Sequence, residues 1–300
     1  MNHGNPFYRQ KTSSGMPYAG NAVLQGCDWV AFQCLWPCEY ACAGKPCQYC
    51  FSGGQFEALA KRHKPMPFIP SPQDVVEVIQ YAVEHDGVNS MQLTGGSTFD
   101  AGREERYITS YMQAINDGPG REILSGELLL YITPPKETDV IDRYFAMGAS
   151  RIACSLEVWD DERAAKITPG KREFTTKQRH LDALTYIAER HGPGKAFSNF
   201  IIGLESIETL TEGATWLAER GVIPSASVWM PFGKPVFLQD RRKLRFCLLV
   251  ELFKSLFYRL SPDEGVSVRV GFYLCSVDEQ SSKVYLAHLG QPFDKLIEQI

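Results

Sequence analysis

The sequence predicts an α/β fold, a partial or full (βα) TIM-type barrel of parallel strands with outer helices. From about residue 71 onward, apolar runs of strand length alternate with stretches of helical period. The connections between them are short, and 300 residues is a length at which one barrel can form a single domain. A doubly wound parallel sheet is the alternative, because it shows the same alternation.

The predicted elements follow one another without an internal repeat. NAVLQ, residues 21–25, is the first candidate strand. A helix then begins at Pro72, with Ser71 as its N-cap and Asp74 in its first turn, and Gly87 ends it. Later strands are predicted at 89–96, 127–133, 151–157, 196–205, 223–232 and 266–275, and later helices at 107–115, 137–147, 175–190, 206–219 and 239–260.

These elements define the expected domain limits. We expect the barrel to span 22–275, with an N-terminal extension at 1–21 and a C-terminal extension at 276–300. In either architecture, ligands bind at the carboxyl ends of the strands. The cysteine-rich segment that follows the first candidate strand is therefore expected at that end.

Composition and charge exclude several classes of function. The formal net charge is -4, so the chain has no basic field that would gather nucleic acid. The most apolar run, 246–260, is interrupted by Glu251, Lys254 and Arg259 and is shorter than the ~20 apolar residues of a membrane span. The first residues are polar and do not resemble a targeting signal. We therefore expect a cytoplasmic protein that binds neither membranes nor nucleic acid.

The nine cysteines indicate a metal centre. Their odd number argues against a complete disulfide framework, and six of them lie between residues 27 and 50. None of the six histidines forms a ligand pair with another at helical or hairpin spacing, which disfavours a mononuclear histidine site. Three cysteines outside the cluster are most simply buried small apolar side chains: Cys154, Cys247 and Cys275.

Cys42, Cys47 and Cys50 have the spacing C-x4-C-x2-C. Three close thiolates can bind three irons of a [4Fe–4S] cluster and leave the fourth iron open for chemistry. Structural zinc is the weaker alternative, with Cys38 as a fourth ligand, because zinc motifs usually contain two C-x2-C pairs. Cys27, Cys34 and Cys38 could also bind a second cluster.

The segment CQYC, with a cysteine a few residues upstream, resembles the radical S-adenosylmethionine (SAM) superfamily. That family usually has the spacing C-x3-C-x2-C with an aromatic residue before the last cysteine, a place that Tyr49 fills here. The spacing is one residue longer if Cys42 is the first ligand. Cys38 could instead be first, with a longer insertion.

Further motifs in the same order carry the resemblance. LTGGST, 93–98, is similar to the glycine pair that approaches the SAM amine, with Ser97 where the family often has Glu. NFIIGLES, 199–206, resembles the segment that packs on adenine, and WMPFGKP, 229–235, the strand end that reads the adenine edge. The residues that the resemblance implies as SAM contacts are Tyr49, Gly95, Gly96, Ser97, Glu157, Ile201, Gly203 and Met230, with Arg172 and Arg179 as candidate cations for the SAM carboxylate.

The pattern resembles most the branch of biotin synthase, HydE-type enzymes and methylornithine synthase, in which a carboxylate such as Glu157 points at the SAM amine. The resemblance implies reductive cleavage of SAM at a [4Fe–4S] cluster. The resulting 5′-deoxyadenosyl radical would abstract hydrogen from a small-molecule substrate, leading to fragmentation, rearrangement or sulfur insertion.

The resemblance also implies an electron donor such as ferredoxin or flavodoxin. A radical SAM methyltransferase is the alternative enzyme. A non-catalytic iron–sulfur carrier and a zinc-stabilised binding module are the alternatives of a different class. No catalytic side chain is assigned beyond the residues that bind the cofactors.

Overall fold

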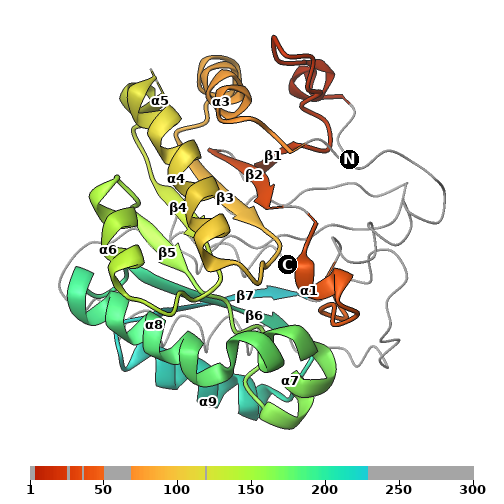
Figure 1. Cartoon of the computed structure of the whole chain (residues 1–300), viewed down its shortest axis with the longest axis vertical. Coiled ribbons are helices and arrows are strands. Elements are labelled where there is room, and N and C mark those ends of the chain that lie inside the picture. The colour runs from red at the N-terminus through yellow and green to blue at the C-terminus, as the bar shows by residue number, and fades with distance from the viewer. Residues whose placement is uncertain (1–3, 26–27, 36, 51–68, 119, 229–300) are drawn as a thin grey trace, which may run out of the picture.

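The computed structural model describes residues 4–25, 28–35, 37–50, 69–118 and 120–228. Within them, seven strands form one sheet in the order β1-β2-β3-β4-β5-β6-β7. β1 pairs antiparallel with β2, and all later pairs are parallel. The strands are β1 (Ala22–Gln25), β2 (Trp29–Leu35), β3 (Ser90–Gly95), β4 (Leu128–Tyr131), β5 (Arg151–Ala153), β6 (Ala196–Ile202) and β7 (Ile223–Val228). The sheet curls as a partial barrel, which confirms the predicted fold class (Figure 1).

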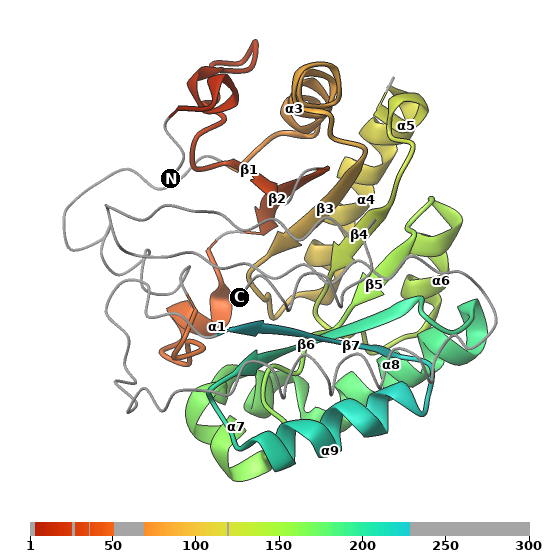
Figure 2. The same ribbon diagram turned by 180° about the vertical axis from the view of Figure 1, so that it is seen from behind.

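The helices lie along the outside of this curled sheet, as Figures 1 and 2 show from opposite sides. They are α1 (Glu39–Cys42), α3 (Pro72–Asp86), α4 (Ala101–Asp117), α5 (Gly120–Ile123), α6 (Asp139–Ala146), α7 (Asp161–Ile167), α8 (Lys177–His191) and α9 (Ile207–Ala218). A π-helical turn, Lys171–Thr175, precedes α8.

The ends of α3 form as the sequence predicts. The Ser71 hydroxyl accepts a hydrogen bond from the Asp74 N–H at 3.1 Å, and the Asp74 carboxylate accepts one from the Ser71 N–H at 2.9 Å. This reciprocal pair satisfies two backbone donors that the first turn would otherwise leave without partners. Gly87 ends the helix at φ 69°, a left-handed conformation that glycine adopts without steric cost.

Alternation along the strands separates two faces of the sheet. Phe32, Leu93, Leu130 and Ile152 lie on one face and form a core with the helices. Burying each of these side chains contributes about 1.5–3 kcal/mol. The opposite face carries polar side chains at Gln33, Gln92, Tyr131, Asn199 and Ser227, with apolar residues such as Leu129 and Ile201 between them. The main apolar core therefore lies outside the barrel strands, and their inner face is mixed polar and apolar.

The first strand of the parallel sheet is not the predicted one. NAVLQ forms the antiparallel β1, and the cysteine segment follows β2, which the sequence reading missed. β2 reads WVAFQCL and lies between cysteines, so the cysteine pattern hides the strand pattern in the sequence. In addition, Phe7, Met16 and Tyr18 from the predicted N-terminal extension are buried in the main core.

The remaining predicted elements agree with the structure within a few residues wherever it describes them. α7 and the π-helical turn are additional, in a stretch where no element was predicted. The predicted helix at 239–260, the strand at 266–275, the C-terminal extension at 276–300 and Met230 lie outside the described residues. Among the described residues, no helix has both the length and the apolar composition of a membrane span.

Glu104 of α4 gives the fold an expected pH dependence. Its carboxyl is buried, and burial raises its pKa from 4.5 to about 7, although bonds from Thr133 and the nearby Arg179 oppose the shift. Between pH 4.5 and 7 the folded chain holds a proton that the unfolded chain has lost, so stability falls as pH rises through this window. We expect the wild type to lose about 3 kcal/mol across it from this group, and Glu104→Gln to lack that loss.

Urea unfolding of both proteins at pH 5 and pH 8 measures the difference. Glu105→Gln is the matched control, because Glu105 is the next residue of α4 and its carboxylate forms an ion pair with Arg143 at the surface. Equal pH dependence in the wild type and Glu104→Gln would contradict the expectation.

Candidate active site

The sequence-predicted site residues gather at the carboxyl end of the sheet, the end toward which the strand arrows point in Figure 1. β2 leads into Cys38 and α1, β3 ends at Gly95, and β5 is followed by Glu157, which bridges to Phe200 of β6. Since carboxyl ends of parallel strands meet at one edge, residues far apart in the sequence come together there.

Gly95 and Gly96 let the cysteine segment pack directly on the end of β3. A Cβ on Gly95 would lie 2.5 Å from the Cβ of Leu35, and one on Gly96 would lie 2.5 Å from the Cα of Cys38. The Gly96 N–H donates to the Leu35 carbonyl at 2.7 Å. The structure therefore explains both glycines by the close approach of protein backbone, whereas the sequence reading explained them by the approach of SAM.

Glu39 joins the cysteine segment to the residues that follow β3. Its carboxylate accepts hydrogen bonds from the Thr98 hydroxyl at 2.7 Å, from the Phe99 N–H at 2.6 Å and from the Arg103 guanidinium. The Glu39 N–H donates to the Ser97 carbonyl at 2.8 Å. Burial alone would raise the pKa of Glu39, but these bonds and the charge of Arg103 lower it below its usual value. Sequence reasoning missed this residue, although it lies beside a cysteine.

Replacing Glu39 with Gln is expected to destabilise the protein by about 1–3 kcal/mol, because a charged acceptor of three hydrogen bonds is lost. Denaturant unfolding measures the change. Glu162→Gln is the control, since Glu162 forms an exposed i,i+4 pair with Lys166, and its loss should change stability by less than about 0.5 kcal/mol. Equal effects of the two substitutions would show that Glu39 does not hold the segments together.

The second half of the cysteine segment is fixed to α7 and to the turn before α8. The Gln48 N–H donates to the Ile167 carbonyl at 2.8 Å, and the Cys50 N–H donates to the Cys47 carbonyl at 3.0 Å. Gly170 fits below this segment, where a Cβ would lie 2.7 Å from the Lys45 carbonyl oxygen. Burial raises the pKa of Cys47 to about 12, so without a metal its neutral thiol is the stable form.

Glu157 is the centre of a polar network. The Lys171 ammonium donates to its Oε1 at 3.2 Å and to the Ser155 carbonyl at 2.7 Å, and the Asn199 amide donates to its Oε2 at 3.3 Å. Tyr49 lies near this carboxylate, and burial and the Glu157 charge together raise the pKa of the Tyr49 hydroxyl well above its usual value. The backbone of Glu157 has φ 70°, a left-handed conformation that costs a residue with a side chain about 1 kcal/mol or more.

Lys171, the neighbour of the predicted Arg172, is the cation that lies beside Glu157. Burial alone would lower its pKa, but Glu157 and Cys47 raise it, so the ammonium stays charged beside the cysteines. The Arg172 guanidinium instead donates to the carbonyls of Val158 and Trp159 and pairs with Asp161 at 3.1 Å. Arg179 lies near Glu104. The only signal for Lys171 in the sequence was its position next to Arg172.

Ile201 and Gly203 are the residues predicted to contact adenine that the structure describes. Ile201 is buried in a small apolar cluster with Val158, Ile167 and Leu204, and the ring of Tyr49 packs against it. Gly203, just after β6, has φ 100°, which a larger residue rarely adopts. Cys154 is buried on the helix-covered face, as predicted, opposite Glu157.

The donor set fits an iron–sulfur cluster better than a single metal ion. Among the described residues, no three His, Cys, Asp or Glu side chains are grouped closely enough to bind one ion. The cysteines of a [4Fe–4S] cluster each bind a different iron, so their sulfurs need not converge on one point. A buried ammonium beside the thiols also suits a negatively charged cluster. Cys34, by contrast, is buried on the helix-covered face beside Tyr111, which gives a second cluster there no support.

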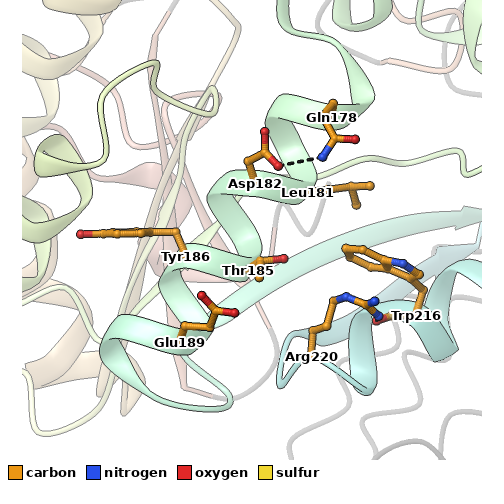
Figure 3. Close-up of a pocket in the computed structure, with 8 residues that line it drawn as sticks. All are labelled: Gln178, Leu181, Asp182, Thr185, Tyr186, Glu189, Trp216 and Arg220. Carbon is orange, nitrogen blue, oxygen red and sulfur yellow. Dashed lines mark hydrogen bonds between the residues drawn. The ribbon is translucent and has the colours of Figure 1, made fainter.

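A surface pocket of about 340 Å³ lies elsewhere, between α8 and α9 (Figure 3). Its lining includes Leu181, Tyr186 and Trp216, with the Arg220 guanidinium stacked on the Trp216 ring. None of the sequence-predicted site residues lines it.

Comparisons with known proteins agree with this architecture. The Radical SAM superfamily matches residues 39–216. A bacteriochlorophyllide c C-7(1)-hydroxylase of Chlorobaculum limnaeum is 25% identical over 232 residues, which cover 74% of this chain and 57% of that protein. The chain thus spans somewhat more than half the length of that curated relative.

Comparison with solved structures gives two further matches. A radical SAM methyltransferase of Sphaerobacter thermophilus has a TM-score of 0.50 at 15% identity, covering 84% of this chain and 72% of that one. Coproporphyrinogen III oxidase (HemN) of Escherichia coli has a TM-score of 0.39 at 16% identity, covering 70% of this chain and 45% of that one.

The family match covers more than half of the chain and includes Cys42, Cys47 and Cys50, the glycine turn and the Glu157 network. The two non-catalytic alternatives, an iron–sulfur carrier and a zinc-stabilised module, are therefore set aside. The chain belongs to the Radical SAM superfamily, whose enzymes use a [4Fe–4S] cluster and SAM.

Proposed function

We propose that this enzyme binds its cluster and SAM at the carboxyl ends of the strands and removes a hydrogen atom from a small molecule held against the inner face of the sheet. The observation that carries the proposal is the group formed by Glu157, Lys171 and Tyr49 beside Cys47 and Cys50. It joins opposite charges and an aromatic ring next to thiols, which suits a ligand with an amine, a carboxylate and an adenine. When bound, the cluster and SAM supply the 5′-deoxyadenosyl radical.

In this proposal Cys47, Cys50 and one cysteine upstream of them bind the cluster. Glu157 accepts from the SAM amine, and the backbone at Gly95, Gly96 and Ser97 lies along the methionine part. Lys171 holds the SAM carboxylate in place of Arg172 or Arg179. An ammonium has three donors, and the contacts to Ser155 and Glu157 account for two of them.

Ile201 and Gly203 would contact the adenine, with Met230 as a further predicted contact. The placement in the biotin synthase-like branch rests on Glu157, whose carboxylate accepts hydrogen bonds from Lys171 and Asn199 just after a strand end. A domain spanning 22–275 and reduction by a ferredoxin or flavodoxin complete the proposal.

The inner face of the sheet bears on the substrate class. Gln33, Gln92, Tyr131, Asn199 and Ser227 carry amide and hydroxyl groups without net charge, and Asn199 also bonds to Glu157 and Ser227. Such groups orient a small molecule through hydrogen bonds. They favour a substrate with several neutral polar groups over a purely apolar one.

EPR of anaerobically reconstituted, reduced protein tests the proposal directly. A [4Fe–4S]⁺ signal should appear and change when SAM is added, and 5′-deoxyadenosine should be released. Glu157→Gln should weaken the SAM-induced change while leaving the cluster signal in place. A cluster signal that ignores SAM would contradict the proposal.

Hydroxylation is the reaction outcome that the curated relative favours, because that relative is a hydroxylase. The substrate would lose one hydrogen atom, give one electron to an iron–sulfur or flavin acceptor, and bond to the oxygen of a water that releases a proton. Bacteriochlorophyllide c is the first compound to test. Product that takes its oxygen from ¹⁸O-labelled water would support this outcome, whereas a methylated product would support the methyltransferase alternative.

A further inference from the structure

The cysteine segment offers two thiols for the place of the first cluster ligand, and the structure treats them differently. Cys38 directly precedes α1 and is partly buried, whereas Cys42 is the last residue of α1 and is exposed. The Cys42 N–H donates to the Cys38 carbonyl at 3.1 Å, so the two lie one helical turn apart. A cluster whose potential is controlled by its protein surroundings is bound where its ligands are shielded and hydrogen-bonded.

Cys38 is held where the two proposed cofactors would meet. Its Sγ accepts a hydrogen bond from the Ser97 N–H at 3.4 Å. Its Cα and Cβ pack so closely on Gly96 that no side chain fits between them. Glu39, the next residue, then ties this turn to Thr98 and Phe99. The thiol of Cys38 is therefore positioned against the glycine turn by bonds on both sides of it.

Cys38 also lies on the side of Cys47 and Cys50. Cys50 and Cys38 are both among the groups close enough to the Cys47 thiol to act on it electrostatically, together with Lys171 and Glu157. The corresponding neighbours of Cys42 are Cys38 and Glu39. Cys38 therefore lies near Cys47, while Cys42 is exposed.

The longer spacing that this requires is accommodated by local structure. The residues between Cys38 and Cys47 form α1 and a tight turn, in which the Lys45 N–H donates to the Tyr40 carbonyl at 2.8 Å. Gly44 within the turn has φ 76°, which glycine adopts freely. The chain therefore folds back on itself instead of extending between the two cysteines.

Building on the function proposed above, we infer that Cys38, Cys47 and Cys50 bind the cluster, in the spacing C-x8-C-x2-C, and that Cys42 is a surface thiol outside the ligand set. Cys42→Ala should keep the iron and sulfide content of the wild type, about four of each per chain, and the SAM-induced EPR change. Cys38→Ala should lose the cluster and the SAM-induced EPR change. Cys38→Ser controls for lost packing against Gly96, because its side chain is closer in size to cysteine.

Either of two results would overturn the inference: loss of the cluster in Cys42→Ala, or its retention in Cys38→Ala. A wild-type cluster that does not respond to SAM would instead defeat the proposed function itself, so the two failures are distinguishable.

Alkylation of the unmodified holoenzyme gives an independent answer. Under anaerobic native conditions, iodoacetamide should modify Cys42 and leave Cys38, Cys47 and Cys50 protected. Fragment-ion mass spectrometry locates the label, since both candidate thiols lie in one peptide. Protection of Cys42 together with labelling of Cys38 would overturn the assignment without any variant.

Discussion

Gly96→Ala is expected to abolish the SAM-induced change in the EPR spectrum and to destabilise the protein. The added Cβ would lie 2.5 Å from both the Cα and the Cβ of Cys38, and 2.9 Å from its backbone nitrogen. Backbone cannot rotate away as a flexible side chain can, so the cysteine turn must move off the end of β3. Overpacking of this kind costs about 1–3 kcal/mol. It would also move Cys38 relative to the glycine turn, which denaturant unfolding and EPR measure separately.

Gly102→Ala is the matched control for this substitution. Gly102 lies in the first turn of α4, and its nearest contacts are the ends of the Arg106 and Asp100 side chains at 3.3 Å. Alanine there should be neutral or stabilise the helix by up to about 1 kcal/mol. Normal cluster content and a normal SAM response in Gly96→Ala would show that the close approach to Cys38 is not required.

Lys171→Met is expected to weaken SAM binding about 10- to 100-fold, because a charge-assisted hydrogen bond to a carboxylate contributes about 1.5–3 kcal/mol. It should also destabilise the protein by about 3 kcal/mol, since it leaves the Glu157 carboxylate without its cation in a largely buried position. Titration of the EPR change with SAM measures the first effect, and urea unfolding measures the second.

The double variant Lys171→Met with Glu157→Gln separates these two effects. Removing both charges should restore much of the stability, because no unpaired buried charge remains. SAM binding should stay weak. Lys166→Met is the control for loss of a lysine, since Lys166 is exposed and its ion pair with Glu162 lies at the surface. Recovery of SAM binding in the double variant would show that Lys171 serves only to neutralise Glu157.

Local chemistry in the sequence predicts α3 well, because its ends depend on neighbours. The first turn of the helix contains the Ser71–Asp74 hydrogen bonds, and the helix ends at Gly87 because of that residue's own backbone conformation. The structure shows each of these residues in the predicted role. The strands β3 to β7 were also found, since buried parallel strands read as apolar runs. β2 was missed because its run contains Cys34 and is flanked by further cysteines, so the metal motif obscured the strand.

The sequence predicts only those residues of the candidate site that belong to motifs. The cysteines, the glycine pair and Glu157 stand in recognisable order along the chain. Lys171 and Glu39 were missed because their roles depend on contacts across 14 and about 60 residues of sequence, respectively. Lys171 and Arg172 are adjacent and both cationic, so the sequence does not indicate which of them faces Glu157. In the structure both lie in the π-helical turn, where Lys171 bonds to Glu157 and Arg172 pairs with Asp161.

The carboxylate of Glu39 has a consequence for how the enzyme matures. Its bonds to Thr98, Phe99 and Arg103 are made entirely within the polypeptide. Domains whose folding depends on a metal are unfolded in its absence. Here the two segments that would flank the iron are already joined by ordinary hydrogen bonds. We therefore expect the newly synthesised apoprotein to be a folded acceptor, to which the cluster is delivered as a last step.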